Sequence, residues 1–269
     1  MCSFHGNQMA AFLKSLLYII VSAAIASCAS QKKGVEASGV SDEVMSHSFP
    51  YTEDFTPVNT SATLAEKAYR DSRQRLNYFL KIALGSEYGL GDFTIKKWDA
   101  DIKIEIHGQP TEADLKTLSN VLSDLRELVA QKINIEIVDI DGNIQMYFIP
   151  QDEFYRYEPP GIVFYGGFFW NWWNYSGEIY KSRIVIAADR ITQTHRSHLI
   201  REELTQALGL MNDAMDYEDS IFFQGYSEIG EYSALDRGII KMLYDDRISP
   251  GMSSFDVKDI LSQLQSNAY

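Results

Sequence analysis

The sequence is short of cysteine and of positive charge. Its 269 residues include only two cysteines, Cys2 and Cys28, and 24 lysines and arginines stand against 37 acidic residues, giving a net charge of −13 at pH 7. A chain this acidic repels nucleic acid and anionic lipid headgroups, so we expect no nucleic-acid partner and no basic patch that attaches it to a membrane. The apolar fraction of 45% is ordinary for a globular domain.

The apolar run near the N-terminus is too short to span a membrane. It covers residues 16–26, follows Lys14 and ends in Ile25-Ala26-Ser27-Cys28, an arrangement typical of a secretion signal. Small residues before a cysteine resemble the lipobox of bacterial lipoproteins. This resemblance implies that residues 1–27 are removed and that Cys28 becomes the lipid-carrying first residue, with Ala29 favouring the outer membrane. The alternative is an uncleaved N-terminal anchor or a buried apolar segment.

Lipidation would leave no cysteine pair to oxidise, because Cys2 would be lost with the signal and Cys28 would carry lipid. The expected location is the cell envelope, on the outer membrane facing the periplasm. Multiple acyl chains hold a protein firmly, since each buried CH₂ contributes about 0.8 kcal/mol. Met9 is an alternative start, because residues 1–8 contain no lysine or arginine.

Residues 28–61 predict a flexible tether. They are rich in Ser, Gly, Glu, Thr and Lys and show neither helical nor strand periodicity. Such a segment spans roughly 30 Å as a random coil. Residues 62–269 contain no internal repeat and mix helical with strand patterns, so we expect a single α+β domain there.

Apolar spacing and turn residues outline this domain. Helical spacing predicts a first helix over residues 62–84, and Ile102, Ile104 and Ile106 alternate with polar residues as in a half-buried strand. Thr111 can cap the helix that follows. Further strands are expected at 133–140, 144–149 and 183–188, with a hairpin at Asp141-Gly142, and a short last helix is expected after Ser254.

The segment from Arg201 to Asp213 is the most informative part of the chain. We expect it on a helix at about 194–211, where 100° per residue puts Glu202, Glu203 and Gln206 on one flank beside an apolar stripe. Gly209 lets the chain turn so that Asn212 or Asp213 comes back toward them. The pattern predicts a polar cluster at a cleft.

This segment resembles the zinc helix of metzincin peptidases, the matrixin branch most closely, although each histidine is replaced. The resemblance places the three zinc ligands at Glu202, Gln206 and Asn212. It places the general base at Glu203 and the methionine-turn residue at Phe222. It also implies a C-terminal helix at about 234–244 and a mixed sheet packed on helices. Exported bacterial proteins that share the Glu-Glu-Leu-Thr-Gln pattern form a family of unknown function, which the chain resembles more closely.

The replaced residues are poor zinc ligands. Catalytic zinc usually takes three protein donors and a water whose pKa it lowers to about 7. Gln206 and Asn212 offer neutral amide oxygens, and Glu202 is a single hard carboxylate. We therefore expect no metal, no cofactor and an inactive scaffold that works by binding. The alternative is a hydrolase that keeps Glu203 as general base with a non-standard metal site.

Three other sites are weaker. His195, His198 and Glu202 could form a displaced metal site, but the two histidines point about 60° apart on a helix. Adjacent Glu202 and Glu203 diverge by 100° and would not flank one glycosidic bond. A calcium site has oxygen donors but no EF-hand spacing; its candidates are Asp213, Asp216, Glu218 and Asp219, with Asn212 as a further donor.

Residues 155–180 are dense in aromatic side chains. Trp170, Trp172 and Trp173, which we expect on a loop, suit stacking on a sugar or docking of a peptide or protein. The alternative is that they only cover the sheet, because most aromatic residues lie in cores. The expected ligand is a protein, a peptide or a glycan.

Overall fold

The computed structural model describes residues 60–84, 93–129, 132–157 and 166–266. Cys28, the signal expected at 1–27 and the tether up to residue 59 therefore lie outside the described residues. Among the helices of the described part, none has the length and apolar character needed to cross a membrane.

The fold is α+β, as the sequence predicts, and is built on one mixed five-stranded sheet with the order β2-β1-β3-β5-β4. Four strands are mutually parallel, and β4 at the edge is antiparallel to β5. Their bounds are Ile102–Gly108 for β1, Ile135–Val138 for β2, Ile144–Ile149 for β3, Gly167–Trp173 for β4 and Ile179–Ala187 for β5.

The hairpin predicted at Asp141-Gly142 was wrong. β2 and β3 both pair in parallel with β1, one on each side, and Ile104 of β1 is in register with a residue of each. The connection therefore crosses over β1 instead of reversing the chain. A Cβ on Gly142 would lie 2.5 Å from the Cβ of Glu105 and 2.7 Å from its nitrogen, and Asp141 has a φ of 61°. The Asp-Gly pair serves this close crossing with the same backbone freedom that a hairpin turn would need.

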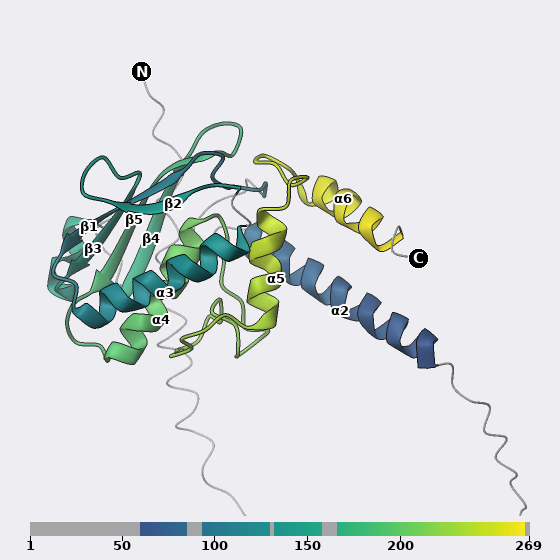
Figure 1. Cartoon of the computed structure of the whole chain (residues 1–269), viewed down its shortest axis with the longest axis horizontal. Helices are drawn as coiled ribbons and strands as arrows, with labels where there is room; N and C mark the ends of the chain where they lie inside the picture. The colour runs from purple at the N-terminus through teal and green to yellow at the C-terminus, as the bar shows by residue number, and fades with distance from the viewer. Residues whose placement is uncertain (1–59, 85–92, 130–131, 158–165, 267–269) are drawn as a thin grey trace, which may run out of the picture.

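Two helices, α3 (Glu112–Leu128) and α4 (Gln193–Ala207), lie side by side on one face of the sheet (Figure 1). Thr111 caps α3 as predicted and forms a capping box with Asp114. Apolar residues of α3 and α4 meet the inward residues of the strands in the main core, which includes Leu118, Leu122, Ile104, Met146, Ile184, Ile200 and Leu204.

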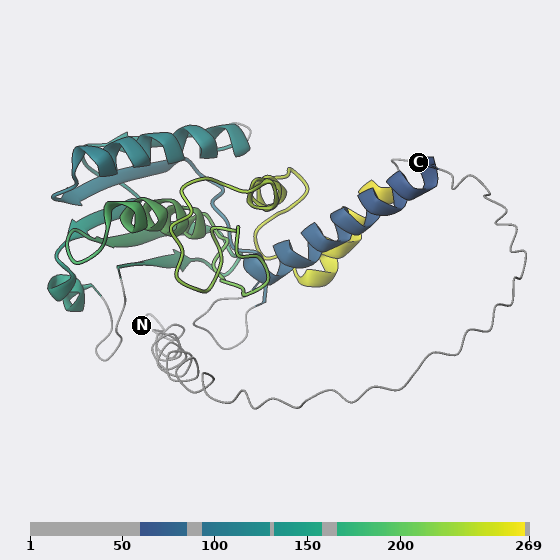
Figure 2. The same ribbon diagram turned by 90° about the horizontal axis from the view of Figure 1, so that it is seen from below.

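The remaining helices lie beyond one end of the sheet. α5 (Ala234–Leu243), expected at 234–244, contacts both α3 and α2 (Thr60–Ala83). α2 and α6 (Ser254–Ser266) run next to each other away from the sheet (Figures 1 and 2). The opposite face of the sheet has a smaller apolar cluster, where Phe154 of the 3-10 helix η1 (Gln151–Arg156) meets Phe168 and Val185.

Helix α4 ends four residues earlier than the expected limit of 211. Its last helical residue is Ala207, and Gly209 follows with a φ of 119°. A Cβ at Gly209 would lie 2.0 Å from the carbonyl oxygen of Lys96. The close passage of this neighbouring segment therefore requires glycine and ends the helix.

The crossing over β1 predicts a stability loss for Gly142→Ala. The added methyl group would overlap the main chain of Glu105, and overpacking of this kind costs about 1–3 kcal/mol. Gly230→Ala is the control, because a Cβ at Gly230 would meet no atom within 4 Å. Urea unfolding followed by tryptophan fluorescence measures both. A Gly142→Ala protein as stable as the Gly230→Ala protein would contradict the crossing.

Candidate functional site

Helix α4, which carries the sequence motif, is buried along all of its length after the first turn. Every residue from His198 to Ala207 is buried, with exposed fractions of 8% for Glu202, 4% for Glu203 and 1% for Gln206. The helix packs on α3, β4 and β5. Polar groups in such a position need partners within the protein, because water does not reach them.

Glu202 pairs with a histidine one turn earlier on the same helix. Its Oε2 lies 3.3 Å from Nε2 of His198, and Nδ1 of His198 donates a hydrogen bond to the carbonyl oxygen of Ile229 at 2.9 Å. Burial lowers the pKa of His198, but the hydrogen bond and charge of Glu202, helped by the Ile229 carbonyl, raise it above its ordinary value of 6.5. The first position assigned to zinc by resemblance is thus one half of a buried ion pair.

Gln206 and Asn212 point to different parts of the protein. The side-chain amide of Gln206 donates to Oδ1 of Asp213 at 2.5 Å. That of Asn212 donates to the carbonyl oxygen of Lys81 at the end of α2, at 2.8 Å. The chain does return toward Gln206 after Gly209, as expected, and Asp213 is the residue that reaches it.

Glu203 faces the edge strand. A Cβ built on Gly167, the first residue of β4, would lie 3.2 Å from Oε1 of Glu203. The absence of a side chain at Gly167 therefore leaves room for this carboxylate between α4 and β4. The expectation that Glu203 is the vestigial general base stays a prediction.

His195 and His198, in the first half of α4, both hydrogen-bond to the segment around residues 226–229. Nδ1 of His195 donates to the carbonyl oxygen of Ser227 at 3.0 Å, two residues before the carbonyl that His198 binds, and the His195 ring stacks on Tyr226 at 4.7 Å. The two imidazole rings lie 6.2 Å apart. Both histidines hold the segment around residues 226–229 against α4.

Two of the acidic residues after α4 already pair with other side chains. Asp213 accepts from Gln206, and Asp216 pairs with Lys81 of α2. Within the described ranges, no group of three histidine, cysteine or acidic side chains is arranged to hold a metal ion. This statement covers the His195, His198 and Glu202 alternative and the acidic segment alike.

The three tryptophans lie on strand β4 and not on a loop, and all are half-buried. Trp173 packs against the main core, with Nζ of Lys96 5.6 Å from its ring centre. Trp172 lies near two cations, Nζ of Lys181 at 5.2 Å and the guanidinium of Arg183 at 5.5 Å. Trp170 is in register with Arg183.

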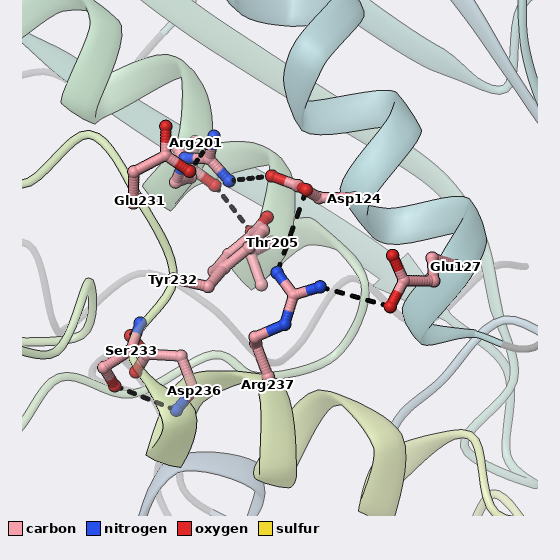
Figure 3. A network of polar contacts seen from close by, with 9 residues as sticks. All are labelled: Asp124, Glu127, Arg201, Thr205, Glu231, Tyr232, Ser233, Asp236 and Arg237. Carbon is pink, nitrogen blue, oxygen red and sulfur yellow. Dashed lines mark hydrogen bonds and ion pairs between the residues drawn. The ribbon is translucent and has the colours of Figure 1, made fainter.

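The sequence reasoning missed a buried arginine. Arg201 is 2% exposed, donates to Asp124 of α3 at 2.7 Å and lies 4.4 Å from the ring centre of Tyr232. Figure 3 shows this network continuing to Arg237 of α5, which lies near Asp124 and Glu127. Helical spacing could have predicted this burial, because Arg201 precedes Leu204 by three residues and therefore falls on the apolar stripe of the helix.

Sequence reasoning also missed two adjoining cavities beside the C-terminal ends of α3 and α5. They measure about 420 and 690 Å³ and share Lys132, Tyr244, Asp245 and Asp246. The smaller one is also lined by Lys97, whose Nζ donates to the carbonyl oxygen of Ile248 at 2.8 Å. Neither of these two cavities includes a residue of α4.

Comparison with known proteins assigns a family. Residues 72–263 match the family described as Protein of unknown function (DUF2927). Because the match covers most of the chain, the chain belongs to this family. No curated protein matches the sequence.

The raised pKa of His198 predicts a pH dependence. Stability from the His198–Glu202 pair is fully present below pH 6.5 and is lost as the pH rises through the higher pKa of the folded state. Glu202→Gln should lower the His198 pKa and flatten this dependence. Denaturant unfolding across pH 5 to 9, with an NMR titration of His198, measures both. A parent protein whose stability rises over this range while the His198 pKa stays below 6.5 would contradict the prediction.

Proposed function

We propose that this chain is a lipid-anchored protein of the cell envelope whose metzincin-like domain acts by binding and not by zinc catalysis. The supporting observation is that the three positions assigned to zinc ligands have separate partners. Glu202 pairs with His198, Gln206 with Asp213, and Asn212 with the main chain of α2. Because these three side chains bind three different partners, they do not converge on one point as the ligands of a metal ion would.

The chemistry of these partners argues further against a metal at this position. A zinc ion would need Glu202 to leave a buried histidine, and removing one partner of a buried pair is costly because the other charge stays uncompensated. Gln206 and Asn212 would supply only amide oxygens in return. Without an ion that acidifies water, Glu203 alone gives no hydrolytic mechanism.

The anchoring part of the proposal comes from the N-terminal sequence. Cys28 follows a short apolar run and small residues, and about thirty residues without periodicity separate it from the domain. The loss of Lys14 with the signal would change the net charge from −13 to −14. A protein this acidic would contact the bilayer through its lipid and present its domain to ligands in the periplasm.

Metal analysis tests the absence of zinc chemistry. We expect purified protein to contain far less than one zinc or nickel ion per chain and to cleave no unstructured protein substrate such as casein. Glu202→Ala should change neither result, and Glu218→Ala, on the exposed acidic segment, is the control. Stoichiometric metal that Glu202→Ala removes and Glu218→Ala retains would favour the alternative of a hydrolase that uses Glu203.

Labelling of the lipid tests the anchor. Cells that express the chain should incorporate labelled palmitate into it, and Cys28→Ser should abolish this labelling. Cys2→Ser is a matched control that should leave the label in place, because Cys2 lies in the expected signal. Labelling that survives Cys28→Ser, or that depends on Cys2, would refute lipidation at Cys28.

A further inference from the structure

A continuous row of aromatic and cationic side chains lies on one face of the sheet. Lys181 and Arg183 lie over Trp172 at 5.2 and 5.5 Å, and Arg183 also lies 5.6 Å from the ring centre of Tyr157. The Tyr157 ring is 4.5 Å from Tyr147, which stacks on His107 at 4.6 Å. We call these six residues the sheet-face ladder; they are Lys181, Trp172, Arg183, Tyr157, Tyr147 and His107.

Strand register places the ladder on the face that α3 and α4 do not cover. Arg183 is in register with Gln145, and Tyr147 with His107, so they point to the same side of the sheet. Their neighbours along the strands, such as Ile184 and Met146, point to the other side and belong to the main core under the helices. The ladder rings are half-buried, and the His107 side chain is 31% exposed.

The two cations of the ladder have no carboxylate partner among the described residues. Within the part of the chain that the structure describes, no carboxylate lies within 4 Å of the charged groups of Lys181 or Arg183, whereas Arg247 and Arg156 have such partners. The charged group of Arg183 donates instead to the carbonyl oxygen of Tyr157, at 3.2 Å. In a chain of net charge −13, this is a local positive region beside aromatic rings.

The hydrogen-bonding groups at the far end of the ladder are fixed in place. Gln145 donates to Glu105 at 3.0 Å and to the carbonyl oxygen of Gly142 at 2.8 Å, and its Oε1 contacts Nε2 of His107. Glu105 also accepts from the backbone nitrogen of Gly142, at 3.0 Å. The ladder therefore ends at one side in His107, which lies 3.3 Å from the Glu105 carboxylate, and carries its two cations at the other side.

We propose that the sheet-face ladder binds an acidic glycan, a sugar chain that carries carboxylates. This inference rests on the proposed binding function and names its site and ligand class. Sugar rings present apolar faces that pack on aromatic rings, and carboxylates form charge-assisted hydrogen bonds with Lys181 and Arg183. The ladder offers both along one surface.

Other polymers fit this surface less well. A peptide that adds a strand would pair with the main-chain groups of the edge strand β4, whereas the ladder residues other than Trp172 lie on inner strands or just after η1. An anionic membrane surface is opposed by the net charge of −13. A glycan needs only the side chains that this face presents.

Calorimetric titration of the purified full chain tests the proposal, with an oligogalacturonate as the acidic probe and a malto-oligosaccharide of equal length as the neutral one. We expect binding of the acidic probe only, weakened by added salt. Trp172→Ala should reduce its affinity at least about fivefold, as loss of a central interface aromatic does. Lys181→Ala should also weaken binding. Lys116→Ala, which removes an exposed cation from α3, is the matched control and should have no effect.

Several results would overturn the proposal. These are no binding of the acidic probe, equal binding of the neutral probe, an equal loss with Lys116→Ala, or Trp172-dependent binding to phosphatidylglycerol vesicles without glycan binding. If Trp172→Ala fails to fold, Lys181→Ala and Trp172→Phe decide, because both leave the sheet intact. Metal content and casein cleavage, measured on the same protein, separate failure of this inference from failure of the proposed binding function.

Discussion

The structure depends on the burial of helix α4, because the polar side chains buried with it need hydrogen-bonding partners within the protein. An unpaired polar group in such a place costs about 1–3 kcal/mol, and more when it is charged. Glu202 is matched by His198, and Gln206 by Asp213. Thr205 bonds to both the carbonyl oxygen of Arg201 and the hydroxyl of Tyr232. The motif residues therefore determine how the chain must fold around them.

Buried and half-buried ion pairs also join α4 to the neighbouring helices. Arg201 draws Asp124 of α3 and the ring of Tyr232 onto α4, and Asp124 in turn lies near Arg237 of α5. A second buried chain runs from Tyr78 of α2 through Ser220 to Asp236 of α5, with oxygen distances of 2.8 and 2.5 Å. Burial raises the pKa of Asp236 although several hydrogen bonds oppose this. These two chains fix α2, α3, α4 and α5 relative to one another more specifically than apolar packing alone would.

Local patterns in the sequence predicted local structure, and the errors arose where distant segments decide. The cap at Thr111 and the half-buried strand marked by Ile102, Ile104 and Ile106 follow from neighbouring residues, and both are confirmed. The hairpin at Asp141-Gly142 was wrong because a close crossing and a tight turn require the same backbone chemistry. Strand β4 was hidden because its aromatic residues occupy both faces of the sheet and leave no apolar and polar alternation.

In the candidate site, too, local spacing was predictable and contacts with distant segments were not. Helical spacing predicted one flank for Glu202, Glu203 and Gln206 and placed His198 one turn from Glu202. The structure confirms the second prediction, whereas Glu203 faces β4 and Gln206 faces Asp213. Spacing could not predict that all of them are buried, since that depends on α3, the sheet and the segment after α4. Nor could it separate Asn212 from this group, because the carbonyl at the end of α2 that Asn212 binds lies far away in the sequence.

The two faces of the sheet thus differ in what they leave for a ligand. On the helix side Glu202, Gln206 and the charged end of Arg201 already have partners within the protein, so a ligand there would have to replace bonds that the fold uses. On the other side Lys181 and Arg183 lie over aromatic rings, and no carboxylate of the described residues pairs with them. At physiological ionic strength, charges beyond about 8 Å are largely screened. A ligand with spaced carboxylates would therefore be attracted by these two cations at contact while feeling little of the remaining acidity, whereas the continuous charge of a nucleic-acid duplex would bring many phosphates close to the acidic surface.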